Sequence, residues 1–246
     1  MRILVTNDDG IESEGIKTLA DALSEKGHIV TVVAPDGNRS AFSHSLSIYK
    51  NLVFKSHCLS DKYEAYTLGG TPADCVKFAC HYFSEKPFDM VCSGINLGNN
   101  LGSDTCYSGT VSAGLEGNFF GIKSIAFSNV SHKPEKLSLN ADFIERNFDR
   151  LFGFANSAYT LNVNMPDGKE NGVKIAKLGR QLYSDEYQKN EDGTFILTGY
   201  PIKHEQDEDC DVEWARKGFV TVTPISLDCA CVMPLLLSVS IATLLI

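Results

Sequence analysis

Short apolar runs alternate with stretches of helical spacing along the first 130 positions of the chain. Residues 2–6 form an apolar run that stops at Asn7-Asp8-Asp9-Gly10, which is typical of a buried strand ending in a turn. Ser13 then caps a predicted helix whose apolar positions recur at helical spacing until Gly27. The apolar run 28–35 follows. Strand, helix and strand in succession predict a right-handed βαβ unit with parallel strands.

The alternation continues beyond this unit and then changes character. Thr71-Pro72-Ala73-Asp74 is a helix start with Thr as the cap and Pro in the first turn. We predict strands around 47–55, 63–68, 88–93, 124–129 and 160–166, and further helices at 109–121 and 137–157. Residues 173–227 show short alternating strands with a turn at Glu191-Asp192-Gly193. The pattern predicts an α/β fold, with an open, doubly wound, mostly parallel sheet and a smaller β-rich C-terminal extension.

Composition and charge narrow the class of protein. The chain has 246 residues, of which 43% are hydrophobic and 22% charged, as in an ordinary globular protein. Its formal net charge is −9 and it has no basic run, which argues against a nucleic-acid polymer as a partner. An acidic protein that handles an anionic substrate needs local positive sources, such as a metal ion or backbone amides.

The cysteines and the two ends of the chain bear on location. Eight cysteines include no C-x-x-C pair, which favours free thiols in a reducing compartment, and the N-terminus has no secretory segment; we therefore expect a cytoplasmic protein. Residues 229–246 carry no charge, but only twelve residues follow Pro234, whereas a membrane span needs about 20. A buried terminal element is the favoured interpretation of this tail, and a membrane anchor is the alternative.

Polar clusters follow several predicted strands, where open α/β sheets bind their ligands. They are Asn7-Asp8-Asp9-Gly10, the loop 38–45, Ser93-Gly94-Ile95-Asn96 with Asn100, and Tyr107-Ser108-Gly109-Thr110. Two adjacent carboxylates either retain a proton or attract a cation. With hydroxyl and amide oxygens they suit Mg²⁺, Mn²⁺ or Ca²⁺, and not zinc. The alternative is that Asp8 or Asp9 only caps a helix.

The run of small residues from 108 to 114 lies at a predicted helix N-terminus, where amides and the helix dipole favour a phosphate. Close helix packing is the alternative explanation for these small side chains. The chain has neither a G-x-G-x-x-G dinucleotide fingerprint nor a Walker loop after its strands, so we expect neither NAD nor ATP-driven chemistry.

The ordered motifs together resemble the SurE family, the survival-protein nucleotidases that hydrolyse nucleoside monophosphates with a divalent metal. The motifs are NDDG at 7–10, APDGNRS at 34–40, GGTPADCV at 69–76, SGINLGNNLG at 93–102, YSGTVSAGLEG at 107–117 and GFVTVTP at 218–224. The resemblance implies a Rossmann-like core carrying the site, placed at 1–130, and a C-terminal part, 131–246. It also implies a homodimer, or higher homo-oligomer, with exchanged C-terminal elements.

The resemblance assigns the site residue by residue. Its metal-ligand positions are Asp8, Asp9, Ser40 and Asn96, and its phosphate-facing positions are Asn100, Ser108, Gly109 and Thr110. Two features depart from the family pattern. Ala41 stands where the family usually has glycine, and the apolar tail replaces a mixed polar helix.

The leading hypothesis is therefore a metal-dependent phosphomonoesterase acting on nucleoside monophosphates, with polyphosphate as a further possible substrate. Asp8 and Asp9 are the catalytic candidates, as general base or nucleophile, and His44 is a candidate acid unless it is an ordinary loop histidine. The alternative from another class is a non-catalytic module that binds a metal and a nucleotide as a sensor.

Overall fold

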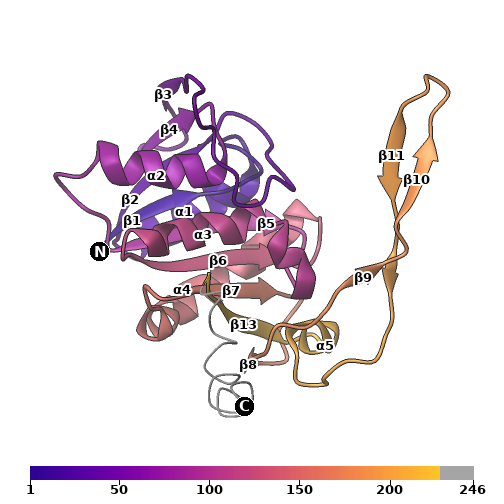
Figure 1. Ribbon diagram of the computed structural model, residues 1–246. Helices are drawn as coiled ribbons and strands as arrows, with labels where there is room; N and C mark the ends of the chain where they lie inside the picture. The colour runs from indigo at the N-terminus through magenta and orange to yellow at the C-terminus, as the bar shows by residue number, and fades with distance from the viewer. Residues whose placement is uncertain (228–246) are drawn as a thin grey trace, which may run out of the picture.

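A nine-stranded sheet forms the centre of the molecule in the computed structural model, which describes residues 1–227. The strand order is β3-β4-β2-β1-β5-β6-β7-β13-β8. The strands are β1 (Arg2–Thr6), β2 (Ile29–Pro35), β3 (Phe54–His57), β4 (Glu64–Leu68), β5 (Met90–Leu97), β6 (Lys123–Asn129), β7 (Thr160–Met165), β8 (Val173–Ile175) and β13 (Val220–Ile225). Helices cover both faces of the sheet (Figure 1), so the α/β prediction is confirmed.

The first βαβ unit forms as its sequence predicts. Helix α1 (Glu14–Glu25) begins after Ser13, whose side chain accepts from the amide of Ile16. Its buried residues pack against the sheet next to α4 (Leu137–Phe154), and this layer holds the largest apolar cluster of the protein. β1 and β2 pair in parallel, so the chain returns to the sheet by the predicted crossover.

The opposite face is covered by α2 (Pro72–Tyr82) and α3 (Gly109–Phe119), which lie against each other. The predicted start of α2 is confirmed: Thr71 and Asp74 form a capping box, and Pro72 occupies the first turn. Helix α3 starts after a short 3₁₀ helix, η1 (Gly102–Cys106), and begins at Gly109 as predicted.

The chain changes its direction of travel across the sheet at β1. From β1 it proceeds to β2 on one side, and β5, β6 and β7 then add on the other side, all in parallel. The boundary between β1 and β5 is therefore the topological switch point. Ligands of open α/β sheets bind there, at the carboxyl ends of the strands.

The sheet continues past residue 130 into the second half of the chain. β13 pairs antiparallel with β7, and β8 then adds in parallel at the edge. A division at residue 130 falls between β6 and α4, so the two proposed parts share one sheet.

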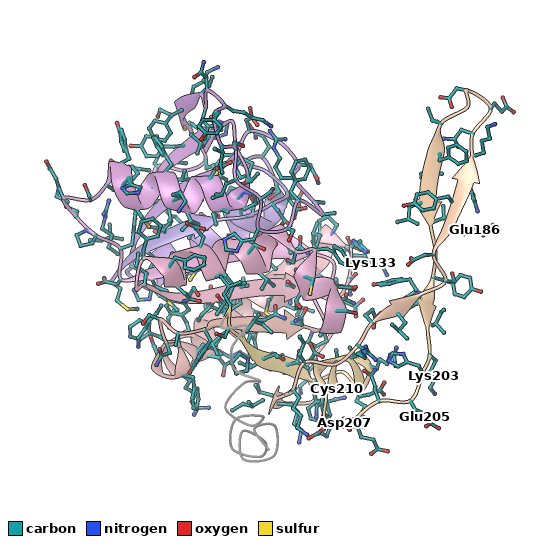
Figure 2. The ribbon with its side chains drawn as sticks, in the orientation of Figure 1. Lys133, Glu186, Lys203, Glu205, Asp207 and Cys210 are labelled. Carbon is teal, nitrogen blue, oxygen red and sulfur yellow. The ribbon has the colours of Figure 1, made fainter. Side chains whose placement is uncertain are left out.

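A thin two-stranded arm stands away from the sheet on one side of the molecule (Figure 1). It contains β9 (Leu182–Tyr183), β10 (Glu186–Lys189), β11 (Phe195–Thr198) and β12 (Pro201–Ile202), paired as two short antiparallel ladders. The predicted turn at Glu191-Asp192-Gly193 joins β10 to β11. Figure 2 shows Glu186 on the arm, apart from Cys210 at the start of α5 (Asp211–Arg216).

Three elements differ from the sequence prediction. The predicted strand 47–55 is wrong over most of its length, because the amide of Ser47 bonds to the Asp74 carboxylate at 3.1 Å and Tyr49 has φ +62°. β5 runs four residues beyond the predicted end at Ser93. Helix α5 was not predicted, since six residues are too few for a helical repeat to show.

The interpretation of the apolar tail, 229–246, falls outside the described residues. Across residues 1–227, the structure contains no helix with the length and apolar character that crossing a membrane requires.

Candidate active site

The turn after β1 is held by the side chain of Asn7. Its Nδ2 donates to the carbonyl of Gly10 at 3.0 Å and to Oγ of Ser13 at 2.7 Å, while its Oδ1 accepts from the amide of Gly10 at 3.2 Å. Asn7 is fully buried, so these bonds fix the turn rigidly to the start of α1. The bonds of Asn7 therefore fix the positions of Asp8 and Asp9, which follow it at the end of β1.

The loop after β2 lies directly against this turn. The amide of Arg39 donates to the carbonyl of Asp8 at 2.6 Å. Gly10 has φ +98°, and a Cβ added there would lie 2.9 Å from the carbonyl carbon of Gly37, so only glycine fits. This close approach brings Ser40, the next residue of the loop, to the same edge of the sheet as Asp8.

The end of β5 supplies the third part of the site. Gly94 has φ +121°, and a Cβ there would lie 2.2 Å from the carbonyl oxygen of Phe127 on β6. Two residues later, the Nδ2 atom of Asn96 donates to the carbonyl of Gly98 at 2.8 Å. Asn96 lines the cavity described below, and its amide oxygen, which this bond does not use, is the kind of atom that a hard cation binds.

The N-terminus of α3 packs against Asp8. Thr110 donates its hydroxyl to Oδ1 of Asp8 at 2.6 Å, and Ser108 caps the helix by accepting from the amide of Val111 at 3.1 Å. A Cβ on Gly109 would lie 2.8 Å from Cβ of Asp8. The small residues of this run allow α3 to pack closely against Asp8. They also place the N-terminus of the helix at this carboxylate.

One cavity of about 880 Å³ joins these segments. Five predicted site residues line it: Asp8, Ser40, Asn96, Asn100 and Ser108. Asp9, Gly109 and Thr110 are not part of its lining but adjoin residues that are. Asn100 is held from behind, because its Nδ2 donates to Oγ of Ser128 at 2.8 Å.

Burial perturbs both carboxylates. Desolvation raises the pKa of Asp8, against the opposing effect of hydrogen bonds from Thr110 and from backbone amides. Desolvation, together with the neighbouring charge of Asp8, raises the pKa of Asp9 to about 6. Among the described residues, no group donates a hydrogen bond to the buried Oδ2 atom of Asp9.

The donor set fits a hard divalent cation. A buried carboxylate oxygen with no donor, next to a second buried carboxylate, is an unfavourable arrangement that a cation relieves. The additional oxygens of Ser40 and Asn96 are ligands of the kind that Mg²⁺ and Mn²⁺ accept. Within residues 1–227, no group of three or more His, Cys, Asp or Glu side chains has the arrangement of a metal site.

The raised pKa of Asp9 predicts a pH dependence. A carboxyl whose pKa is higher in the folded protein stabilises the fold most at low pH, and this contribution is lost as the pH rises through about 6. Without metal, the unfolding temperature should therefore decrease as the pH is raised from about 4 to about 7. Asp9→Asn should make this decrease smaller.

Added Mn²⁺ should have the opposite trend, because cation and proton compete for the same oxygens. The stabilisation by Mn²⁺ should increase as the pH rises through about 6. Thermal unfolding of wild type and Asp9→Asn, with EDTA or Mn²⁺, measures both trends. A Mn²⁺ effect that is independent of pH would contradict competition for Asp9.

The histidines are arranged differently from the sequence hypothesis. His44 lies 2.9 Å from a carboxylate oxygen of the buried Glu116, which also pairs with Lys77 at 2.6 Å. His44 is not among the residues that line the cavity, whereas His132, just beyond β6, is. His132 follows a strand end, so the rule that found the other clusters also applies to it.

Residues of the arm complete the cavity and were not predicted. Gln181, Leu182, Tyr183, Asp185, Leu197, Thr198 and Gly199 form this part of the lining. No local sequence signal marks them, because they reach the cavity only through the path of the arm.

Ala41, where the chain departs from the family pattern, has φ +60°. This left-handed conformation costs a residue with a Cβ about 1–2 kcal/mol, whereas glycine adopts it freely. Ala41→Gly should therefore raise the free energy of unfolding by about 0.5–1 kcal/mol, after the greater chain entropy of glycine is subtracted.

Urea unfolding measures this change, and Ala141→Gly in α4 is the matched control. In a right-handed helix the same substitution should lower the free energy of unfolding by about 1 kcal/mol. Equal losses in both variants would show that the loop conformation at Ala41 imposes no strain.

Comparisons with known proteins show the family of the chain. The family model described as Survival protein SurE matches residues 3–185. The chain belongs to the SurE family. A protein named 5′-nucleotidase SurE from Caldanaerobacter subterraneus subsp. tengcongensis is 37% identical over 233 residues, which cover 92% of this chain and 91% of that protein. The protein of the same name from Clostridium botulinum (strain 657 / Type Ba4) is 40% identical over 240 residues, covering 93% and 94%.

A solved structure shows the same architecture. The crystal structure of the SurE protein from Aquifex aeolicus matches with a TM-score of 0.81 at 32% identity, covering 97% of this chain and 98% of that one. The match extends over nearly the whole chain, so the fold of the SurE family includes the second half of this molecule as well as its core.

Proposed function

We infer that the protein is a nucleotidase, a phosphomonoesterase that hydrolyses nucleoside monophosphates to nucleoside and phosphate. The observation that carries this inference is the placement of Asp8 with Ser40, Asn96 and Ser108 around one cavity at the switch point of a SurE-family fold. Similar proteins from several bacteria carry the name 5′-nucleotidase SurE. This family relationship favours an enzyme over a sensor that binds without turnover.

We assign Asp8, Asp9, Ser40 and Asn96 to hold a divalent cation, with Mg²⁺ or Mn²⁺ the best match to oxygen ligands. Such a cation would act as a Lewis acid on a phosphate oxygen and would lower the pKa of a water molecule. The hydroxyl of Thr110 orients the Asp8 carboxylate through its 2.6 Å bond. Asp9 contributes the buried oxygen that has no donor among the described residues.

The remaining residues of the site would bind the phosphate. Asn100 lines the cavity and is 6% exposed, and one of its two amide hydrogens is available beyond its bond to Ser128. Ser108, Gly109 and Thr110 begin α3, whose dipole favours an anion at this end. Asp8 and Asp9 are the carboxylates that we assign to the chemical step, as general base or nucleophile.

A phosphate-release screen tests the proposed function. Purified protein is incubated with nucleoside 5′- and 3′-monophosphates and with polyphosphate, in Mg²⁺, Mn²⁺ or EDTA. We expect phosphate from at least one nucleoside monophosphate with metal, and none with EDTA. Tight nucleotide binding without turnover would support the sensor instead, and EDTA-resistant turnover would contradict the metal assignment.

The arm favours assembly with a second copy of the chain. An isolated hairpin is marginally stable in water, yet Tyr187, Phe195, Ile196 and Tyr200 are all more than half exposed on it. A homodimer or higher homo-oligomer would cover these side chains. Phe195→Glu should then reduce the molar mass measured by light scattering, and an unchanged mass would count against the arm as the contact.

A cytoplasmic location remains part of the proposal. Cys58, Cys75, Cys80, Cys92, Cys106 and Cys210 are free thiols, which a reducing compartment preserves. Fractionation of cells that express the full chain measures the location of the protein directly.

A further inference from the structure

The cavity is larger and chemically more varied than a phosphate site requires. At one end, Asp8, Asn96 and Asn100 present polar groups. Toward the arm, the lining includes the aromatic and aliphatic side chains of Tyr107, Leu182, Tyr183 and Leu197, beside polar residues such as Gln181, Asp185 and Thr198. A volume of about 880 Å³ is in the range of sites that bind a whole organic ligand.

Tyr107 is the aromatic residue next to the phosphate end, by which we mean the end of the cavity lined by Asp8, Asn96 and Asn100. It immediately precedes Ser108, the cap of α3, and its side chain is 66% exposed. Its backbone is held on both sides: its amide donates to the carbonyl of Asp104 at 3.0 Å, and its carbonyl accepts from the amide of Ser43 at 3.1 Å. An exposed ring on a fixed backbone is a preformed surface for a flat ligand.

The side of the cavity formed by the arm, here called the arm wall, is hydrogen-bonded to η1, the segment just before Tyr107. Tyr183 donates its hydroxyl to Oδ2 of Asp104 at 2.5 Å. Ser103 donates to the carbonyl of Gln181 at 2.7 Å, and the amide of Gln181 donates to Oγ of Ser103 at 2.9 Å. Because η1 leads directly into Tyr107 and α3, these bonds set the position of the arm wall relative to the phosphate end.

We propose that Tyr107, with Leu182 and Leu197 of the arm, forms a subsite for the base of the nucleoside monophosphate. This inference rests on the proposed function and names the part of the substrate that the function left open. Aromatic rings stack on nucleobases with little dependence on which base is present, so Tyr107 suits any base.

The charged residues at this end of the cavity support a neutral occupant. Asp104 and Asp185 both line this part of the cavity. Carboxylates repel an extended polyanion, whereas an uncharged base beside them meets no repulsion. The subsite therefore favours a nucleoside monophosphate over polyphosphate.

Steady-state kinetics on two substrates test the subsite. Tyr107→Ala is compared with wild type on adenosine 5′-monophosphate and on ribose 5-phosphate, which has the same phosphate and sugar without a base. We expect KM for the nucleotide to rise about 5- to 100-fold, corresponding to the loss of one stacking contact. For ribose 5-phosphate, kcat/KM should stay within about twofold of wild type.

Two variants serve as controls. Tyr107→Phe keeps the ring and should behave as wild type on both substrates. Tyr49→Ala removes a fully exposed tyrosine that is not in the cavity lining and should change neither substrate. Equal losses by Tyr107→Ala on both substrates would overturn the subsite, as would no loss on either.

The proposed function and the subsite fail separately. If wild type releases phosphate from none of the nucleoside monophosphates in the screen described above, the nucleotidase inference fails. Calorimetric binding of adenosine 5′-monophosphate then decides the subsite, which is supported by weaker binding to Tyr107→Ala and overturned by equal binding.

Discussion

Replacing Asp8 with asparagine is expected to reduce metal-dependent phosphate release by at least about 100-fold while leaving the fold intact. Asparagine has the same shape, and its carbonyl oxygen still accepts from the hydroxyl of Thr110, which lies 2.6 Å from Oδ1 in the wild type. The substitution removes the negative charge and turns the second carboxylate oxygen into an amide donor. If Asp8 holds the cation, losing this charge weakens cation binding and therefore lowers the activity.

Stability should change in the opposite direction. Burial raises the pKa of Asp8 because a charged carboxylate is poorly solvated there. Asparagine carries no charge to desolvate, so the metal-free Asp8→Asn protein should unfold at a temperature equal to or higher than wild type. Such a gain of stability with a loss of activity is typical of a functional residue.

Kinetics with Mn²⁺ and thermal unfolding with Mn²⁺ or EDTA measure the two effects. Mn²⁺ should stabilise wild type and have a much smaller effect on Asp8→Asn. Asp61→Asn, an exposed aspartate outside the cavity lining, is the matched control and should retain both activity and the Mn²⁺ effect. Turnover of Asp8→Asn at the wild-type rate would refute the assignment.

Much of the core could be predicted because its signals are local. The apolar run 2–6 and the polar turn after it define the end of β1, and the capping residues Ser13 and Thr71 define the starts of α1 and α2. Once the strands are parallel, their carboxyl ends must lie at one edge. For this reason the sequence alone predicts that Asp8, Ser40 and Asn96, far apart along the chain, lie together.

What could not be predicted depends on long-range contacts. The apolar residues near 47–53 have no strand partner, because Asp74 of α2 takes the amide of Ser47. The sequence leaves both roles open for His44, as an acid or as an ordinary loop histidine, because its pairing with Glu116 is a contact between residues 72 positions apart. The arm is held at the cavity by long-range contacts, among them the bond from Tyr183 to Asp104, 79 positions apart in sequence.

Gly109→Ala is expected to lower activity by about 10- to 100-fold, although alanine is the better helix former. Gly109 is the first residue of α3, and a Cβ there would lie 2.8 Å from Cβ of Asp8 and 3.2 Å from Cγ of Pro72. Neither neighbour is the free end of a flexible side chain. The added methyl group must therefore displace the Asp8 carboxylate or the start of α3.

Overpacking at this contact should also lower the free energy of unfolding by about 1–3 kcal/mol. Gly153→Ala is the matched control, since Gly153 lies in α4 and a Cβ there would meet nothing within 4 Å. In that open helical position the same methyl should raise the free energy of unfolding by about 0.5–1 kcal/mol and leave kcat/KM unchanged. Opposite signs of the two stability changes, with activity lost only in Gly109→Ala, would show that the absence of a side chain at Gly109 positions Asp8. If Gly109→Ala keeps the wild-type kcat/KM, the position of this carboxylate does not depend on its contact with α3.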